Sequence, residues 1–179
     1  MVFLISGASH TGKTVLAQKM LEKYHIPYLS VDHQKLGLIR SGNTHLTPED
    51  DEELTAYLWP IVREMIKTAI ENQQDLIVEG GYLPYDWQKD FSEDYLRKIR
   101  SLWLVMTDDY IRTHFEQIRA HANDVEKRMD DSGCTQEWLM EINREVLAQC
   151  RLHGCRFHLI NDEYNIKPEL WEVGHDNHP

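Results

Sequence analysis

The pattern G-x-x-x-x-G-K-[ST] is matched by eight consecutive residues, Gly7-Ala8-Ser9-His10-Thr11-Gly12-Lys13-Thr14. The apolar run Val2-Phe3-Leu4-Ile5 stands before this stretch, and a segment of helical character begins behind it at Val15. A loop of this pattern between a strand and a helix binds phosphate groups. Its glycines let successive N–H groups and the positive end of the helix point at the phosphates. The sequence therefore predicts a protein that binds a nucleoside triphosphate.

Each part of this phosphate loop has an expected role. We expect the backbone of residues 7–12 to hold the phosphates of ATP, with the side chain of His10 incidental. The Lys13 ammonium is expected to bridge phosphate oxygens, and the Thr14 hydroxyl to ligate Mg²⁺. The alternative is a glycine-rich turn that carries a lysine without function.

The chain is long enough for one well-buried core and too short for two ordinary domains with a linker, since it has 179 residues. We therefore expect a single domain over residues 1–179. A content of 41% hydrophobic and 27% charged residues is typical of a soluble globular protein, and no apolar run approaches membrane-spanning length. The odd cysteine count, Cys134, Cys150 and Cys155, shows no paired metal spacing and favours a reducing cytoplasm.

The chain is acidic, with a formal net charge of −11. Its long-range field repels polyanions, so nucleic acid is not an expected partner. Clusters such as Glu49-Asp50-Asp51-Glu52-Glu53 are expected to form a solvated face, the alternative being an acidic docking site.

Short apolar runs alternate with helical patterns along the whole chain. This alternation predicts a parallel sheet with helices on both faces. The expected strands are Val2 to Ser6, Tyr28 to Val31, Asp75 to Glu79, Ser101 to Met106, and Arg156 to Ile160.

Three further helices are expected from their end signals. The helix behind the phosphate loop should run to about Tyr24. A second should start with Thr47 as its cap and Pro48 in its first turn, and Pro60 should kink or split it. Its core-facing positions are Leu54, Leu58, Ile61, Val62, Met65, Ile66, Ala69 and Ile70. A third helix should start at Thr135 and end at Gly154, with Trp138, Leu139, Ile142, Val146 and Leu147 in the core.

Polar residues follow each expected strand, at the edge where open parallel sheets bind ligands. Asp32 follows the second strand and is a candidate general base or acceptor-binding group, the alternative being a cap of the next helix. Glu79 ends the third strand, where it could orient Mg²⁺-bound water or contact an acceptor; the alternative is a structural salt bridge. Gly80 and Gly81 then permit close approach of a ligand or a tight turn.

Arginines on the carboxyl-terminal half of the chain are candidates for neutralising a transferring phosphoryl group. Arg112 and Arg119 share a helix face, and Arg128 lies in the polar segment from Ala120 to Gly133, which we expect to be exposed and mobile. A surface ion-pair ladder through Glu116 would explain Arg112 and Arg119 equally well.

The phosphate loop and the segment Val78-Glu79-Gly80-Gly81-Tyr82-Leu83-Pro84 resemble the small P-loop kinases. This group contains adenylate kinase, shikimate kinase, gluconate kinase and the zeta-toxin-like and 2-phosphoglycerate-kinase-like enzymes. The segment is similar to the D-G-F-P-R run of nucleotide kinases, with Glu79 for the Asp and Tyr85 where the Arg would stand. The resemblance implies a three-layer α/β fold with a five-stranded parallel sheet in the order 2-3-1-4-5. It also implies an acceptor-binding helical insertion at about 33–73 and a lid at about 120–134.

The same resemblance implies roles for particular residues. Asp32 falls where these kinases carry an acceptor-binding or catalytic Asp, Arg119 and Arg128 would close over ATP, and residues Asn161 to Tyr164 would lie near the adenine. The expected activity is Mg²⁺-dependent transfer of the ATP γ-phosphate to a hydroxyl or phosphate of a small acceptor, by a monomer or homodimer. One alternative is a nucleoside monophosphate kinase, although the Arg missing at Tyr85 weakens it. The other is a regulator that binds a nucleotide without transferring phosphate.

Overall fold

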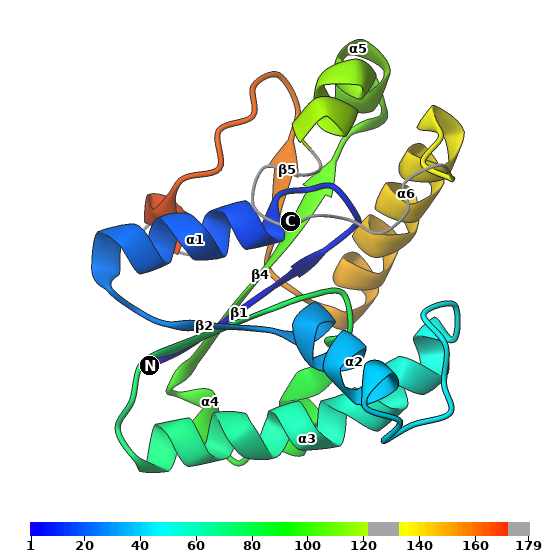
Figure 1. Cartoon of the computed structure of the whole chain (residues 1–179). Helices are drawn as coiled ribbons and strands as arrows, with labels where there is room; N and C mark the ends of the chain where they lie inside the picture. Colours follow the sequence, from blue (N-terminus) through cyan, green and yellow to red (C-terminus); the bar gives the residue numbers. More distant parts are fainter. Residues whose placement is uncertain (122–132, 172–179) are drawn as a thin grey trace.

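Five parallel strands form one sheet in the order β2-β3-β1-β4-β5 (Figure 1). The computed structural model describes residues 1–121 and 133–171. The strands are β1 (Val2–Gly7), β2 (Tyr28–Ser30), β3 (Leu76–Glu79), β4 (Ile99–Met106) and β5 (Phe157–Ile160). Each predicted strand is present with its ends shifted by at most two residues. The predicted fold class and strand order are confirmed.

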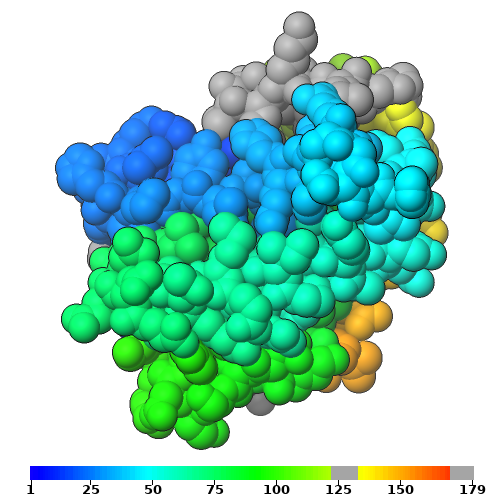
Figure 2. Space-filling view, turned by 60° about the horizontal axis from the view of Figure 1, so that its bottom comes forward, coloured from blue at the N-terminus to red at the C-terminus, as the bar shows by residue number. Residues whose placement is uncertain are grey.

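Helices connect the strands and cover both faces of the sheet, with α1 on one face and α3 on the other, and α6 contributes side chains to both cores (Figure 1). They are α1 (Lys13–Tyr24), α2 (Val31–Arg40), α3 (Asp51–Glu71), α4 (Glu93–Leu96), α5 (Asp108–Ala120) and α6 (Gln136–His153), with 3₁₀ turns at Trp87–Asp90 and Pro168–Trp171. In the space-filling view α3 crosses the face that it covers, between α2 and the segment that holds α4 (Figure 2). Within the described ranges, none of the helices combines the length and apolarity needed to cross a bilayer.

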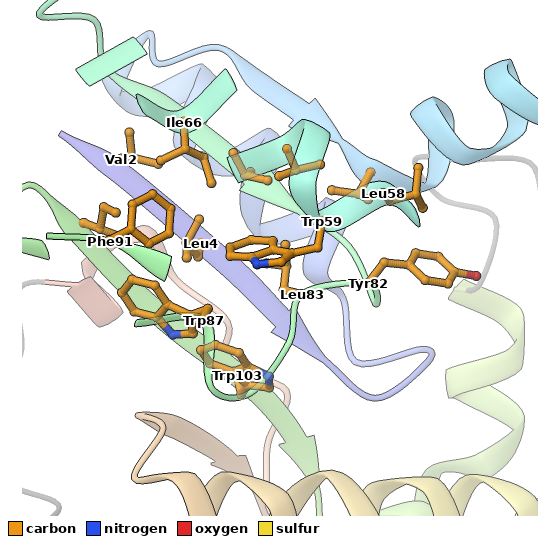
Figure 3. Packing of buried hydrophobic residues seen from close by; sticks show 14 of the residues in the cluster. Val2, Leu4, Leu58, Trp59, Ile66, Tyr82, Leu83, Trp87, Phe91 and Trp103 are labelled. Carbon is orange, nitrogen blue, oxygen red and sulfur yellow. The ribbon is translucent and has the colours of Figure 1, made fainter. Parts of the chain in front are cut away.

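Side chains of the strands alternate between two separate cores, as the pleat requires. Leu4 and Trp103 point to the side of α3, where they pack with Leu58 and Ile66 (Figure 3). Ile5 points to the other side and packs against α1 and α5. Because both faces are covered, the sheet is rigid and its carboxyl edge is a fixed platform for loops.

Helix α3 begins later than the sequence predicts. Asp50, not Thr47, occupies the N-cap position, and Pro48 lies before the helix. The carboxylate of Asp50 accepts hydrogen bonds from the backbone N–H of Thr47 at 2.8 Å and from its hydroxyl at 3.0 Å. These bonds hold a turn in front of the helix, so the cap prediction is wrong.

Pro60 does not split α3, which runs unbroken from Asp51 to Glu71. Pro60 and Ala56, whose carbonyl loses its helical partner, are both exposed, so water can satisfy that carbonyl. Two of the predicted core positions on this helix, Ile61 and Met65, are instead exposed by 37% and 41%.

Helix α6 begins and ends as predicted. The Thr135 hydroxyl accepts a hydrogen bond from the Trp138 N–H at 3.1 Å, and Gly154 ends the helix with φ at 65°. Leu139 is buried as predicted, but Trp138 is exposed by 39% and does not belong to the core. Its indole lies edge-on to the imidazole of His10, with ring centroids 6.4 Å apart.

Replacing Trp103 by alanine should lower the free energy of unfolding by about 3–5 kcal/mol, because it removes the largest fully buried side chain of the α3-side core. Urea denaturation followed by circular dichroism measures this loss. Leu152→Ala, at a position 74% exposed, is the control and should change stability by less than about 0.5 kcal/mol. Equal effects of the two substitutions would contradict this account of the core.

Candidate functional site

The loop between β1 and α1 curls tightly, and glycine is required at both of its ends. A Cβ on Gly7, where φ is +134°, would lie 2.2 Å from the carbonyl oxygen of Leu104 on β4. A Cβ on Gly12, where φ is +82°, would lie 1.6 Å from the hydroxyl oxygen of Tyr164. At Gly7 the clash is with backbone, whereas at Gly12 the Tyr164 side chain would have to move and the positive φ would be strained for any other residue.

The side chains inside the loop close it around one carbonyl group. The hydroxyl of Thr11 and the ammonium of Lys13 both donate to the Ala8 carbonyl oxygen, at 2.8 Å and 2.9 Å. Lys13 stands in the first turn of α1, where no acidic side chain is present to neutralise the positive end of the helix. This arrangement can receive the negative oxygens of a phosphate chain.

His10 has contacts that the sequence did not predict. Its backbone adopts φ of 64°, and its Nδ1 atom lies 2.9 Å from the hydroxyl oxygen of Ser9. With the Trp138 contact, the imidazole connects the phosphate loop to the start of α6. His10 therefore contributes to the shape of the loop through its side chain as well as its backbone.

Glu79 lies next to the phosphate loop at the end of β3. It is 1% exposed and pairs in register with Ile5 on β1 and Ser30 on β2. Its Oε2 atom accepts a hydrogen bond from the Thr14 hydroxyl at 3.2 Å. The two predicted metal-binding residues, 65 positions apart in the chain, are thus in contact. A hydroxyl and a carboxylate are the oxygen ligands that Mg²⁺ uses together with phosphate oxygens, so these residues fit the metal of a nucleotide site.

Asp32 stands in the first turn of α2, and Ser30 takes the N-cap position. The alternative that Asp32 caps this helix is therefore wrong. Its side chain is 37% exposed, with Oδ1 3.5 Å from the Lys35 ammonium. Its Oδ2 atom would lie 3.5 Å from a Cβ on Gly80. The carboxylate thus lies beside the end of β3, next to the residue that follows Glu79.

The structure describes two of the three candidate arginines, Arg112 and Arg119. Arg119 is exposed in the last turn of α5, with its guanidinium carbon 5.9 Å from the centroid of the Phe115 ring. Arg128 and most of the expected lid at 120–134 lie outside the described residues. Arg112 forms ion pairs with Asp109 at 3.0 Å and Asp108 at 3.6 Å, a surface ladder whose acids differ from the expected Glu116.

The segment after β5 reaches the phosphate loop through Tyr164. Its hydroxyl donates to the Thr11 carbonyl oxygen at 3.5 Å, and its ring lies against Gly12. Asn161, the residue expected near the adenine, follows β5 directly and is exposed. Tyr164 thus touches the loop, and Asn161 stays a predicted contact of the base.

A set of polar side chains beside Asp32 was not identified from the sequence. The Lys35 ammonium donates to the Tyr82 hydroxyl at 2.7 Å, which in turn donates to Asp51 Oδ1 at 2.9 Å. Burial, followed by the nearby charges of Asp51 and Asp32, raises the pKa of Tyr82 above its usual value, so its phenol stays protonated. The only sequence signal was the position of Lys35 one helical turn after Asp32.

Comparison with known proteins bears on the fold of this chain. No family model and no curated protein matches the sequence. Among solved structures, shikimate kinase from Bacteroides thetaiotaomicron superposes with a TM-score of 0.53 at 18% identity, over 97% of this chain and 99% of that one. Deoxyadenosine kinase from M. mycoides superposes with a TM-score of 0.54 at 11% identity, over 95% and 94%. With its sheet order and phosphate loop, the chain has the fold of the small P-loop kinases.

Proposed function

We propose that this protein is an ATP-dependent phosphotransferase that moves the γ-phosphate of ATP to a hydroxyl group of a small molecule. The observation that carries the proposal is the place of Asp32. Its half-exposed carboxylate lies beside Gly80, the residue that directly follows Glu79. The Glu79 carboxylate in turn contacts Thr14 of the phosphate loop. A candidate base and a candidate nucleotide site thus meet at one edge of the sheet.

The roles of the residues follow from these positions. The loop backbone holds the β-phosphate, and Lys13 exchanges its neutral partner, the Ala8 carbonyl, for oxygens of the γ-phosphate. Thr14 and Glu79 would hold Mg²⁺, and the ion would supply positive charge beside the phosphate oxygens. Asp32 accepts the proton of the acceptor hydroxyl as its oxygen attacks the γ-phosphorus. Positioning of the two substrates supplies most of the rate enhancement, as in other phosphoryl transfers.

Arg119 and Arg128 complete the proposal as residues that stabilise the transferred charge. Arg119 stands in the last turn of α5 and is exposed. Closure of the segment that follows α5 would bring both arginines over ATP and exclude water from the reaction.

A nucleoside monophosphate as acceptor is disfavoured by Tyr85. This residue stands where nucleotide kinases carry an arginine, and its ring stacks between Trp103 and His153 at centroid distances of 6.2 Å and 6.1 Å. A stacked phenol cannot neutralise the phosphate of a nucleotide acceptor. The remaining alternative, a regulator that binds ATP without transfer, predicts ATP binding with no effect of any acceptor on turnover.

The protein should release ADP in a Mg²⁺-dependent reaction that one class of small acceptor stimulates. A coupled assay over nucleotides, sugars, phosphorylated acids and aminoglycosides measures this release. Lys13→Ala should abolish the stimulation, because it removes the cation that bridges the phosphates. Tight ATP binding with a flat response to every acceptor would support the regulator instead.

Asp32→Asn should lower kcat about 10²-fold to 10⁴-fold, because an amide cannot accept the hydroxyl proton. The KM for ATP should change little, since Asp32 stands apart from the phosphate loop. Asp94→Asn makes the same chemical change at a side chain 85% exposed on α4 and should leave kcat unaltered. Unchanged turnover in Asp32→Asn would show that Asp32 is not the base.

A further inference from the structure

A hydrogen-bonded cluster beside Asp32 has no part in the chemical step described above. Lys35 on α2, Tyr82 after β3, and Asp51 at the start of α3 form a continuous chain with Asp32. Figure 3 shows the Tyr82 side chain with its hydroxyl pointing away from the aromatic core. Because Tyr82 comes two residues after Gly80, this cluster lies where an acceptor must sit to present a hydroxyl to Asp32.

The Lys35 ammonium, the cation of this cluster, already contacts other groups of the protein. The Lys35 ammonium lies 2.7 Å from the Tyr82 hydroxyl oxygen, 3.5 Å from Asp32 Oδ1 and 4.7 Å from the centroid of the Tyr82 ring. The Lys35 side chain is only 13% exposed. Its charge is outnumbered by those of Asp32 and Asp51, so the cluster taken together with Asp32 carries a net charge of −1.

Other cations of α2 and α3 stand elsewhere. Arg63 and Lys67 both contact the Glu64 carboxylate, at 2.8 Å and 2.9 Å. Arg40 is in the last turn of α2, about 12 Å along the helix axis from Asp32. Among the described lysines and arginines of these two helices, Lys35 is therefore the one placed beside Asp32, and it already contacts Asp32 and Tyr82.

The polar atoms that this region offers a ligand are mainly hydrogen-bond acceptors. The Tyr82 hydroxyl receives a bond from Lys35 and uses its own hydrogen on Asp51, so it has no hydrogen to donate to a ligand. Besides the third hydrogen of the Lys35 ammonium, what is left are carboxylate oxygens of Asp32 and Asp51. A ligand must therefore bring donors, and hydroxyl or ammonium groups supply them. A phosphate or carboxylate would meet like charge.

A separate hollow of about 380 Å³, to which Gly81 contributes, lies on the α3 side of the sheet. This volume is within the range of small-molecule sites, about 300–1,000 Å³. Two acids, Glu52 and Asp86, line it together with Tyr85 and His153. An acceptor that reaches from the cluster into this hollow would meet these two further acids.

We infer that the phosphoryl acceptor is a neutral or cationic compound with several hydroxyl groups, such as a sugar, a sugar alcohol or an amino sugar, and not a phosphorylated or carboxylated one. This inference rests on the proposed kinase function and names the substrate class of the same site. In the transfer, the acceptor oxygen forms a bond to the γ-phosphorus, the bond to the bridging oxygen of ADP breaks, and the hydroxyl proton goes to Asp32.

Acceptors that share a carbon skeleton and differ in charge test the inference. ADP release is measured with glucosamine, glucose, gluconate and glucose 6-phosphate, and with inositol and inositol monophosphate. Binding of each compound is measured in parallel by calorimetry, with a non-hydrolysable ATP analogue present. We expect the uncharged or cationic compounds to bind and to exceed their acidic partners at least tenfold in kcat/KM. Higher turnover of the acidic partners overturns the inference and leaves the kinase function standing. Neither turnover nor binding of any compound, with ATP bound, overturns both.

The variant Asp51→Asn separates the cluster from the catalytic base. It removes a charge that strengthens hydrogen bonds to a cationic acceptor, so the KM for an amino sugar should rise about tenfold. The KM for ATP and the kcat should change little. Glu53→Gln, an exposed carboxylate in the same helical turn, is the matched control and should leave both KM values unchanged. An unaltered KM for the amino sugar in Asp51→Asn would overturn the assignment of this cluster to the acceptor.

Discussion

The carboxylate of Glu79, buried at the end of β3, is the constraint on which the rest of the site depends. Removing a carboxylate from water costs several kcal/mol unless partners compensate it. Glu79 is 1% exposed between β1 and β2, yet it stands beside the Thr14 hydroxyl, at the positive end of α1. Under the proposed function, a bound cation and the phosphates that accompany it would stabilise this carboxylate. The phosphate loop and Glu79 are thus in contact and are proposed to act as one binding unit, although a long stretch of chain separates them.

The parallel sheet brings these parts together without any contact along the sequence. All of its strands end at the same edge, so the phosphate loop after β1, Asp32 after β2, and Glu79 at the end of β3 become neighbours. The strand order places β3 between β2 and β1, and the nucleotide side and the acceptor side therefore meet over Glu79 and Gly80. The two packed cores keep this edge in place while the side chains above it remain open to ligands.

The sequence predicted the elements whose signals are local. Apolar runs marked the five strands, and Thr135 and Gly154 marked both ends of α6. The start of α3 was predicted wrongly because Asp50 binds Thr47 and so replaces it as the cap. Trp138 was assigned to the core from its helical period, which cannot show that this position of α6 faces His10. The cluster of Lys35, Tyr82 and Asp51 escaped prediction because its bonds join residues 47 and 31 positions apart with no shared pattern.

The Mg²⁺ dependence of ATP affinity tests the central claim most directly, because it addresses the unit formed by the phosphate loop and Glu79. Calorimetric titration of ATP, with and without Mg²⁺, is carried out on the unaltered protein and on Glu79→Gln, with circular dichroism to verify that the variant is folded. The account predicts that Mg²⁺ tightens ATP binding to the unaltered protein and that Glu79→Gln loses most of this gain. Absence of ATP binding, or an equal Mg²⁺ effect in the two proteins, would contradict it.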